Sequence, residues 1–258
     1  SIAHIKPAAP APIIITSNKN GEIKGFYNVC RHRGCELVKK SHRRPVIMCP
    51  YHRWTYTLDG DLKGVPLYKP DKEVFDKKDY SLYPIKTEVR NNIIFANLDN
   101  NMETNVNDYY KDAFKILDNY PLKKCKIVKE KTYNINANWK LLIDNFIEYY
   151  HLPGVHPKLV KNSGMDEHVC TQEEGMYVGF KTDPLTSSGE VIDVNTNKKF
   201  TGILKEDENA AHFQMLFPNI FYFLFPNHLF SVIIEPVSPT KSIEKAVLMV
   251  EDDSDEEW

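Results

Sequence analysis

The sequence predicts an α+β protein of two domains, an all-β domain followed by a domain that combines strands with helices. Short apolar runs separated by turn residues continue to about residue 98, a polar stretch follows, and the strongest helical pattern appears at about residues 138–151. We therefore expect domains at residues 1–98 and 99–258. The first is expected to be incomplete at its N-terminus and the second at its C-terminus, because the chain lacks an initiator Met and stops in an acidic run.

Turn signals mark the strands of the first domain. Residues 13–15 are expected to form a strand, and residues 18–21 a hairpin-type turn, since Asn and Gly tolerate the positive φ that such turns require. Further strands are expected at residues 45–48, 54–57 and 92–96. The polar residues 98–107 indicate a linker.

The second domain is expected to mix helices and strands. Helices are predicted at about residues 107–118 and 138–151, strands begin at Cys125, and a loop-rich region extends to about residue 205. The chain closes with apolar strands, which are predicted at residues 219–225, 229–235 and 246–250.

Composition excludes several classes of protein. The chain has 258 residues, is 42% hydrophobic and carries a net charge of -2, so no global charge attracts nucleic acid or anionic lipid. The longest apolar run, residues 220–225, is too short to span a bilayer, and no signal peptide opens the chain. Five cysteines are an odd count for a disulfide framework and indicate a reducing compartment such as the cytoplasm.

Two short segments each pair one cysteine with one histidine. One residue separates Cys30 from His32, two separate Cys49 from His52, and sixteen lie between the pairs. Such a set can hold one structural zinc ion, or a [2Fe–2S] cluster in which two histidines replace two cysteines on one iron. The alternation of Cys and His favours the cluster, because each segment then offers a thiolate to one iron and an imidazole to the other.

These residues resemble the Rieske motif of oxygenases, Cys-x-His followed by Cys-x-x-His, and the flanking residues 27–34 and 49–54 are similar too. The resemblance implies that the two cysteines ligate one iron and the two histidines the other.

Cys35 departs from one branch of Rieske proteins. Those of bc-type complexes carry a disulfide between their two loops, but Tyr51 stands where the second cysteine would be. This favours the lower-potential oxygenase or ferredoxin type.

A second set of polar residues lies on the predicted helix at 138–151 and just after it. The helix carries a polar row at positions i, i+4 and i+7: Asp144, Glu148 and His151. Pro153 and Gly154 end the helix, which allows His156 to turn back towards His151. Two imidazoles with one carboxylate are the ligands of non-haem Fe(II) oxygenases.

This segment resembles the catalytic helix of Rieske oxygenase large (α) subunits. The resemblance implies a helix-grip catalytic domain, in which an antiparallel sheet wraps helices, with iron held by His151, His156 and a downstream aspartate. Asp253 is the expected third ligand and Asp252 the alternative. Members of this family form trimers in which the cluster of one subunit faces the iron of its neighbour. Glu148 occupies the position of the carboxylate that links the two centres, and Asp144 is predicted to be a second catalytic carboxylate.

The implied reaction activates O₂ with electrons from NAD(P)H, delivered by a separate reductase or ferredoxin. The aromatic strands suit a planar ring by stacking or a quaternary ammonium by cation–π contact. We expect hydroxylation of an aromatic ring, with oxidation of a choline-, carnitine- or betaine-type compound as the alternative. Basic residues near the Cys–His segments form either a docking face for an acidic electron donor or a solvated surface: Arg31, Arg33, Lys39, Lys40, Arg43, Arg44 and Arg53.

Two other classes of protein remain open at this point. A Rieske electron carrier without catalysis leaves Glu148, His151 and His156 unexplained. A zinc-stabilised binding protein would be colourless, whereas a Rieske cluster makes a protein red-brown.

Overall fold

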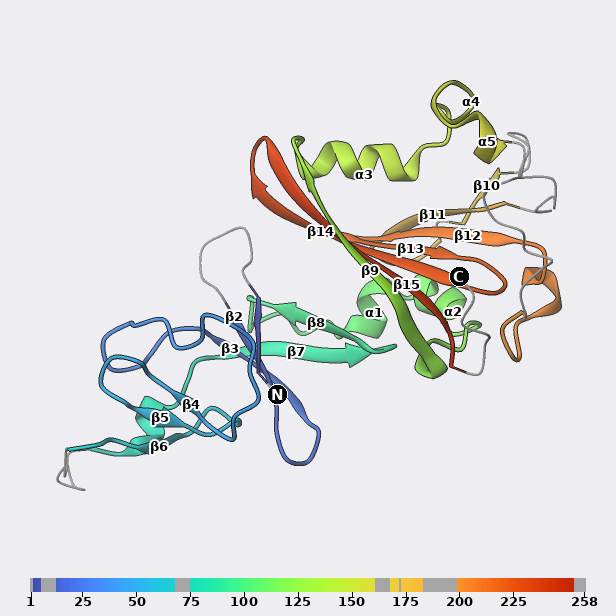
Figure 1. The fold of residues 1–258 in the computed structure, drawn as a ribbon. Coiled ribbons are helices and arrows are strands. Elements are labelled where there is room, and N and C mark those ends of the chain that lie inside the picture. Colours follow the sequence, from blue (N-terminus) through green and yellow to red (C-terminus); the bar gives the residue numbers. More distant parts are fainter. Residues whose placement is uncertain are drawn as a thin grey trace. The chain divides into compact units, whose positions relative to one another are not determined.

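The computed structural model describes residues 2–5, 13–67, 75–160, 168–171, 173–182 and 199–252. The chain forms two compact units, Ser1–Glu103 and Thr104–Trp258, and Figure 1 labels their elements. Within the described residues, no helix has both the length and the apolar character needed to cross a membrane.

The N-terminal unit contains two antiparallel sheets. The five-stranded sheet has the order β1-β2-β3-β7-β8, with bounds Ile2–Ile5, Ile13–Ser17, Ile23–Tyr27, Pro84–Arg90 and Ile93–Asn97. The three-stranded sheet consists of β4 (Ile47–Met48), β5 (Thr55–Tyr56) and β6 (Leu62–Gly64). A 3-10 helix, η1 (Lys77–Tyr80), precedes β7. The turn between β2 and β3 forms as predicted, because Asn18 Oδ1 accepts two backbone N–H groups and Gly21 takes a φ of 80°.

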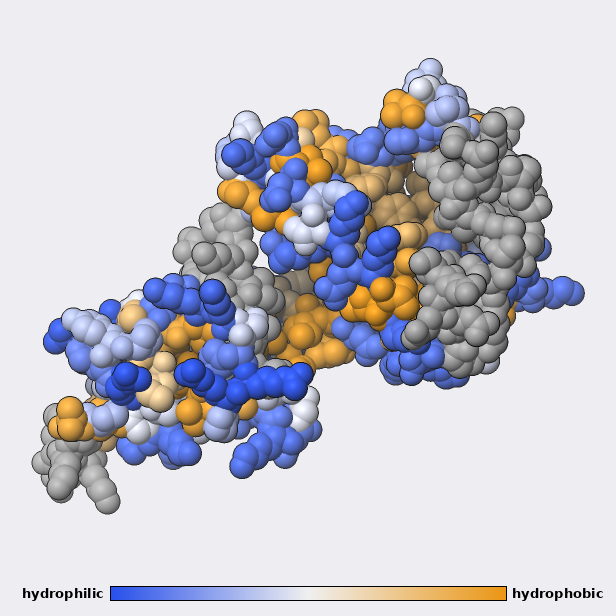
Figure 2. Space-filling view, viewed as in Figure 1, coloured by the Kyte–Doolittle hydropathy of each residue, from blue (hydrophilic) through white to orange (hydrophobic). Residues whose placement is uncertain are grey.

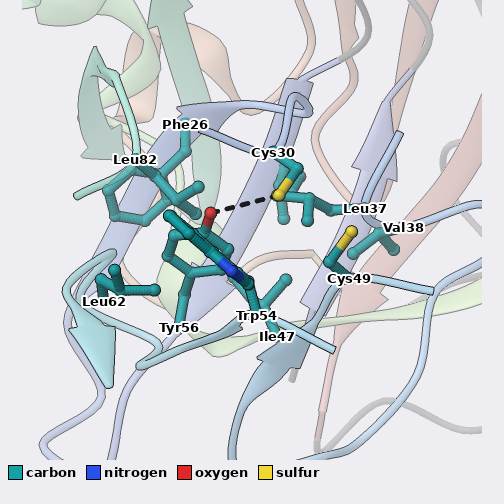
Figure 3. Packing of buried hydrophobic residues seen from close by; sticks show 11 residues of the cluster. Phe26, Cys30, Leu37, Val38, Ile47, Cys49, Trp54, Tyr56, Leu62 and Leu82 are labelled. Atoms are coloured by element: carbon teal, nitrogen blue, oxygen red, sulfur yellow. Dashed lines mark hydrogen bonds between the residues drawn. The ribbon is translucent and has the colours of Figure 1, made fainter. Parts of the chain in front are cut away.

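The core of this unit contains the two cysteines of the predicted motif. Figure 3 shows how these cysteines pack among apolar side chains from both sheets and the intervening loops. The buried members are Ile14, Phe26, Cys30, Leu37, Val38, Ile47, Cys49, Trp54, Tyr56, Leu62 and Leu82. The cysteine side chains therefore reach into a packed interior.

The C-terminal unit is built on a seven-stranded antiparallel sheet with the order β10-β11-β12-β13-β14-β15-β9. The strands are β9 (Cys125–Ile135), β10 (His168–Cys170), β11 (Tyr177–Thr182), β12 (Ala211–Leu216), β13 (Ile220–Leu224), β14 (Leu229–Ser238) and β15 (Lys241–Glu251). Two 3-10 helices, η2 (Leu122–Lys124) and η4 (Lys205–Asp207), lie before β9 and β12.

Helix α3 (Trp139–Ile147) packs on one face of this sheet (Figure 1). Asn138 caps the helix, because its side chain accepts the Lys140 N–H at 3.0 Å. The apolar side of α3 packs against residues from β12, β13 and β14: Met215, Phe221, Val232 and Ile234. The sheet thus supports the helix that directly precedes the predicted iron ligands His151 and His156.

Two helical predictions differ from the structure. The helix expected at 107–118 is divided into α1 (Val106–Tyr110) and α2 (Asp112–Leu117) by Lys111, whose φ is 37°. The break follows from tertiary contacts, because the Asp112 N–H donates to the Glu174 carbonyl at 3.1 Å. The helix expected at 138–151 ends at Ile147, and two short helices follow, α4 (Leu152–Val155) and α5 (Pro157–Val160). Strands β10 and β11 occupy part of the stretch that was expected to be loop.

Gly60 is expected to be essential for packing of the first unit. Its φ is 90°, and an added Cβ would lie 2.4 Å from the Phe26 ring, whereas Gly21 has a φ of 80° and open space around it. Gly21→Ala should cost about 1–2 kcal/mol of stability from the backbone alone. Gly60→Ala should cost about 1–3 kcal/mol more, because it also overpacks the core. Urea titrations followed by Trp54 fluorescence measure both, and equal losses would contradict the role of Phe26.

Candidate metal centres

The two Cys–His loops share one backbone design. In each loop the ligand cysteine N–H donates to the carbonyl five residues later, at 2.8 Å in both cases. The N–H four residues after each cysteine donates back to the cysteine carbonyl, at 2.9 and 3.1 Å. The fourth residue has a positive φ in both loops, 70° at Gly34 and 62° at Arg53. The two loops therefore share one backbone geometry although their Cys–His spacings differ by one residue.

The four side chains of the motif meet between these loops. Cys30 and Cys49 are each 2% exposed, and their side chains interact with one another. The imidazole centroids of His32 and His52 lie 4.7 Å apart. Trp54 stacks on the His32 ring at 4.7 Å with an interplanar angle of 8°, which fixes the plane of that imidazole. Two buried thiols beside two adjacent imidazoles fit a cluster that needs two sulfur and two nitrogen ligands.

Burial affects the ionisation of these ligands. Desolvation raises the pKa of the Cys30 thiol. Desolvation also lowers the pKa of His32, and the nearby positive charges of His52 and Arg33 lower it further. His32 is therefore biased to the neutral form that binds metal. The thiolate form that coordinates iron needs the metal itself to displace the proton.

Tyr56 is a polar group at this site that the Cys–His motif does not single out. Its hydroxyl accepts the Arg31 N–H at 3.1 Å and lies 3.3 Å from Cys30 Sγ, so that it can donate to the sulfur (Figure 3). Asn28 is a second such residue. Its buried side chain bonds the backbone of Leu37 and Val38 and fixes the chain beyond the first loop. A buried tyrosine in a short strand and an asparagine before the motif carry no sequence signal of these contacts.

Cys35 lies beside the ligand thiols without a disulfide. Its side chain packs against the core that contains Cys30 and Cys49, and its thiol donates to the Glu36 carbonyl at 3.5 Å. All five cysteines are thiols. The partner position in the second loop is Tyr51, whose side chain is exposed.

Glu148 ends helix α3 and orients His151. It adopts an extended backbone conformation directly after the helix, and its Oε2 accepts the His151 N–H at 3.2 Å. Its Oε1 pairs with Nδ1 of the same imidazole. Although partial desolvation opposes ionisation, hydrogen bonds from the His151 ring and from the backbone of His151 and Tyr150 lower the pKa of Glu148. The carboxylate therefore leaves Nε2 of His151 as the nitrogen available to a metal.

His156 lies close to His151, as the turn in the sequence suggested. The two ring centroids are 5.5 Å apart with an interplanar angle of 75°. Metal–nitrogen bonds of about 2.1 Å place two imidazole centroids on one ion roughly 4.5–5.5 Å apart. The histidine pair therefore fits a shared ion. The chain turns at Glu148 rather than at Pro153, which lies inside α4.

The structure does not bring the predicted aspartates next to His151 and His156 within the described residues. Asp253 lies outside the described residues, and Asp252 is exposed at the end of β15 with Oδ1 3.7 Å from Lys126 Nζ. Asp144 is exposed on α3. In the described parts of the chain, no three His, Cys, Asp or Glu side chains gather closely enough to hold one ion. A Rieske cluster does not need such a triad, since each iron takes two protein ligands.

Asn145 is a polar neighbour of the predicted iron ligand His151 that the sequence did not single out. Its Nδ2 lies 3.4 Å from Nε2 of His151. The amide is exposed near the end of α3. It can contact the imidazole nitrogen that Glu148 leaves open.

An apolar pocket lies between the end of α3 and the sheet. Hydrophobic side chains fill the recess under α3 in Figure 2. The lining residues come from α3, β11, β12 and β13: Phe146, Ile147, Val178, Gly179, Phe180, Phe213, Gln214, Met215, Phe221 and Phe223. Five phenylalanines and no charged residue line it. Ile147, one of the lining residues, directly precedes Glu148 in the chain.

Comparison with known families identifies both units. A Rieske [2Fe–2S] domain model matches residues 6–84, and a model of the ring hydroxylating alpha subunit (catalytic domain) matches residues 122–258. Fold and sites thus define a Rieske non-haem iron oxygenase, with a [2Fe–2S] domain and a mononuclear iron catalytic domain. The chain belongs to the ring-hydroxylating alpha-subunit family.

Several relatives are similar to this chain. The glycine betaine monooxygenase oxygenase subunit of Pseudomonas aeruginosa is 35% identical over 153 residues, which cover 58% of this chain and 34% of the relative. The carnitine monooxygenase oxygenase subunit of Acinetobacter pittii is 35% identical over 173 residues, which cover 65% of this chain and 46% of the relative. The matches thus span less than half of these relatives.

Solved structures share the fold. The quaternary ammonium Rieske monooxygenase CntA superposes with a TM-score of 0.79 at 25% identity, over 98% of this chain and 66% of that one. Naphthalene 1,2-dioxygenase from Rhodococcus sp. superposes with a TM-score of 0.80 at 22% identity, over 98% of this chain and 66% of that one. The expected α+β architecture, an all-β Rieske domain before an antiparallel sheet with helices, is confirmed.

Removal of the Tyr56 hydroxyl should lower the reduction potential of the cluster. A donor to a cluster sulfur stabilises the reduced, more negative state, and one such bond is worth about 1–2 kcal/mol. Tyr56→Phe should therefore lower the midpoint by about 40–90 mV. Tyr80→Phe is the control, because Tyr80 packs on Trp54 and Phe75. Spectroelectrochemical titration measures both, and an unchanged midpoint in Tyr56→Phe would refute the hydrogen bond.

Proposed function

We propose that this protein is the oxygenase component of a monooxygenase that oxidises a quaternary ammonium compound. The relatives named for glycine betaine and carnitine carry this proposal, and the apolar pocket under α3 supports it. A quaternary nitrogen offers no hydrogen to donate, so a site must recognise its positive charge through ring faces or through carboxylates. The pocket provides phenylalanines and no carboxylate.

The relatives favour this substrate class over an aromatic ring. Those at 35% identity are named for glycine betaine and carnitine, whereas naphthalene dioxygenase, at 22%, supports the fold alone. Ring faces stack on aromatic substrates as well as on cations. The aromatic ring that we expected from the sequence therefore becomes the second candidate.

His151, His156 and a downstream aspartate, expected to be Asp253, are proposed to hold a mononuclear iron. Cys30, Cys49, His32 and His52 are proposed to hold the cluster. The bound iron supplies reductive activation of O₂ with two electrons and two protons, so that one oxygen enters a C–H bond and the other leaves as water. Hydroxylation of an N-methyl group gives an N-hydroxymethyl ammonium, which breaks its C–N bond to release formaldehyde and a tertiary amine.

Glu148 is proposed to couple the two centres. Its carboxylate contacts both the ring and the backbone of His151. In a trimer of the kind expected from the family, the remaining lone pairs can accept a hydrogen bond from a cluster histidine of the partner subunit. The electron donor is proposed to be an NAD(P)H-dependent reductase or ferredoxin.

Glu148→Gln should leave both metals bound and abolish turnover. The amide keeps the shape of the side chain but loses the charge that orients the imidazole, so we expect a loss of at least about 100-fold in kcat. Iron and acid-labile sulfide analysis checks metal loading, and stopped-flow reduction checks that the cluster still accepts electrons. Asp144→Asn tests the other predicted carboxylate on the same helix. A fully active Glu148→Gln protein would refute the coupling role.

Substrate class is tested by supplying the iron-loaded protein and a reductase with glycine betaine, carnitine, choline and naphthalene. Formaldehyde and dimethylglycine should form from betaine, with oxygen uptake matching product. We expect 3,3-dimethylbutanoate, in which carbon replaces the quaternary nitrogen, to bind about 5–30-fold more weakly than betaine, because it lacks the cation–π term. Turnover of naphthalene without turnover of any ammonium compound would overturn the proposal.

A further inference from the structure

A third thiol lies beside the two cysteines that are proposed to hold the cluster. Cys35 packs against the buried core that contains Cys30 and Cys49. Its side chain contacts that of Cys49 directly, whereas Cys30 acts on it only at longer range. A Rieske cluster takes two sulfur ligands from the protein. The two loops therefore gather one more thiol than the cluster uses.

The position of Cys35 follows from the backbone geometry that the two loops share. Its carbonyl accepts the Cys30 N–H, just as the carbonyl of Trp54 accepts the Cys49 N–H. Trp54 reaches from this position to the other loop, where it stacks on His32. Cys35 reaches from the equivalent position to Cys49 of the second loop. The contact between the two thiols is therefore set by the backbone of both loops.

The three thiols differ in how far they are accessible. Cys30 and Cys49 are each 2% exposed, whereas Cys35 is half-buried. A small oxidant in solution therefore meets Cys35 before it meets either ligand cysteine. The Cys30 sulfur also has a polar neighbour of its own, the Tyr56 hydroxyl at 3.3 Å. Cys35 and Cys49 are thus the pair best placed to react with one another.

We propose that Cys35 and Cys49 form a reversible disulfide when the protein loses its cluster, and that this bridge protects Cys49 from irreversible oxidation. The proposal rests on the proposed function, in which Cys30 and Cys49 ligate a [2Fe–2S] cluster. While the cluster is bound, Cys49 is a ligand and Cys35 remains a thiol. Once the cluster is lost, the Cys49 thiol becomes available to its neighbour.

The oxidant is hydrogen peroxide, the two-electron reduction product of O₂. Its O–O bond breaks as one oxygen joins the Cys35 sulfur, which gives a sulfenic acid and one water. The Cys49 sulfur then attacks the sulfenic sulfur, so that an S–S bond forms, the S–O bond breaks and a second water leaves with the thiol proton. Two thiols are oxidised and one peroxide is reduced. A dithiol reductant restores both thiols by exchange.

The bridge performs two tasks that the lost cluster leaves open. It joins the first loop to the second by closing a ring of residues 35–49, which restrains the chain where the metal no longer does. It also keeps Cys49 at an oxidation level that thiols can reverse, whereas sulfinic and sulfonic acids are not reduced by thiols. The protein can therefore accept a new cluster after reduction.

Peptide mapping tests the bridge directly. The cluster-loaded full chain is treated with hydrogen peroxide until the visible absorbance of the cluster is lost, its thiols are alkylated, and trypsin is added without reductant. Trypsin cleaves after lysine and arginine and places the three cysteines in separate peptides: residues 25–31, 34–39 and 44–53. We expect mass spectrometry to find 34–39 joined to 44–53. Any other pairing, or three unbridged peptides, would overturn the proposal.

Reloading of the cluster tests the protective role. The oxidised proteins are reduced with dithiothreitol and supplied with Fe²⁺ and sulfide under anaerobic conditions. Cys35→Ser should load its first cluster like the unchanged protein, but after peroxide it should regain about threefold less, because Cys49 is then oxidised beyond the reach of thiols. Cys170→Ser removes an exposed thiol from the other unit and should recover like the unchanged protein. Equal recovery in Cys35→Ser would refute the protective role.

These readouts separate the inference from the proposed function. They use no substrate, so a protein that loads its cluster and fails to oxidise ammonium compounds leaves the result standing. Cys49→Ser should not load a [2Fe–2S] cluster, as its absorbance and acid-labile sulfide will show. A Cys49→Ser protein that does load one would overturn the proposed ligation, and this inference with it.

Discussion

The contact between the Glu148 carboxylate and His151 is the interaction on which the catalytic unit depends. It ends α3 at Ile147, because the carboxylate accepts a backbone N–H of the following turn. It also fixes the imidazole through Nδ1 and leaves Nε2 for a metal. One side chain thus determines where the helix stops, where the chain turns towards His156, and which nitrogen is left open for the proposed iron.

In the Rieske unit, backbone hydrogen bonds position the predicted ligands. Two loops with equal hydrogen bonds and a positive φ at equal positions place one cysteine inside the core and one histidine near the surface in each case. Burial of Cys30 and Cys49 excludes water from the sulfurs, and Tyr56 supplies a hydroxyl there. The imidazoles lie at the accessible side, where an electron enters or leaves.

The sequence was most informative where chemistry requires fixed spacing. Local spacing predicted the pairing of Cys30 with His32 and the nearness of His151 to His156. Periodicity predicted an all-β unit followed by a unit that mixes helices and strands. The helix predicted at 138–151 was too long, because α3 ends at Ile147. Periodicity counts apolar positions and cannot show that the Glu148 side chain bonds the backbone three residues later. The break at Lys111 depends on a hydrogen bond to Glu174, 62 residues beyond Asp112, and no local pattern contains it.

Charge balance is compatible with the proposed ammonium substrate, because the pocket holds no carboxylate. A divalent iron repels a cation, and at an effective dielectric constant of about 20 two unit charges 4 Å apart already interact by about 4 kcal/mol. Glu148, whose lowered pKa keeps it ionised at neutral pH, and the aspartate expected to ligate the iron offset the two charges of the metal. Little net field then remains for the proposed substrate, and the pocket lining adds phenylalanine rings and no further charge. A carboxylate within the pocket would instead compete for the proposed iron, so an aromatic lining is compatible with the proposed cationic substrate beside a cationic metal.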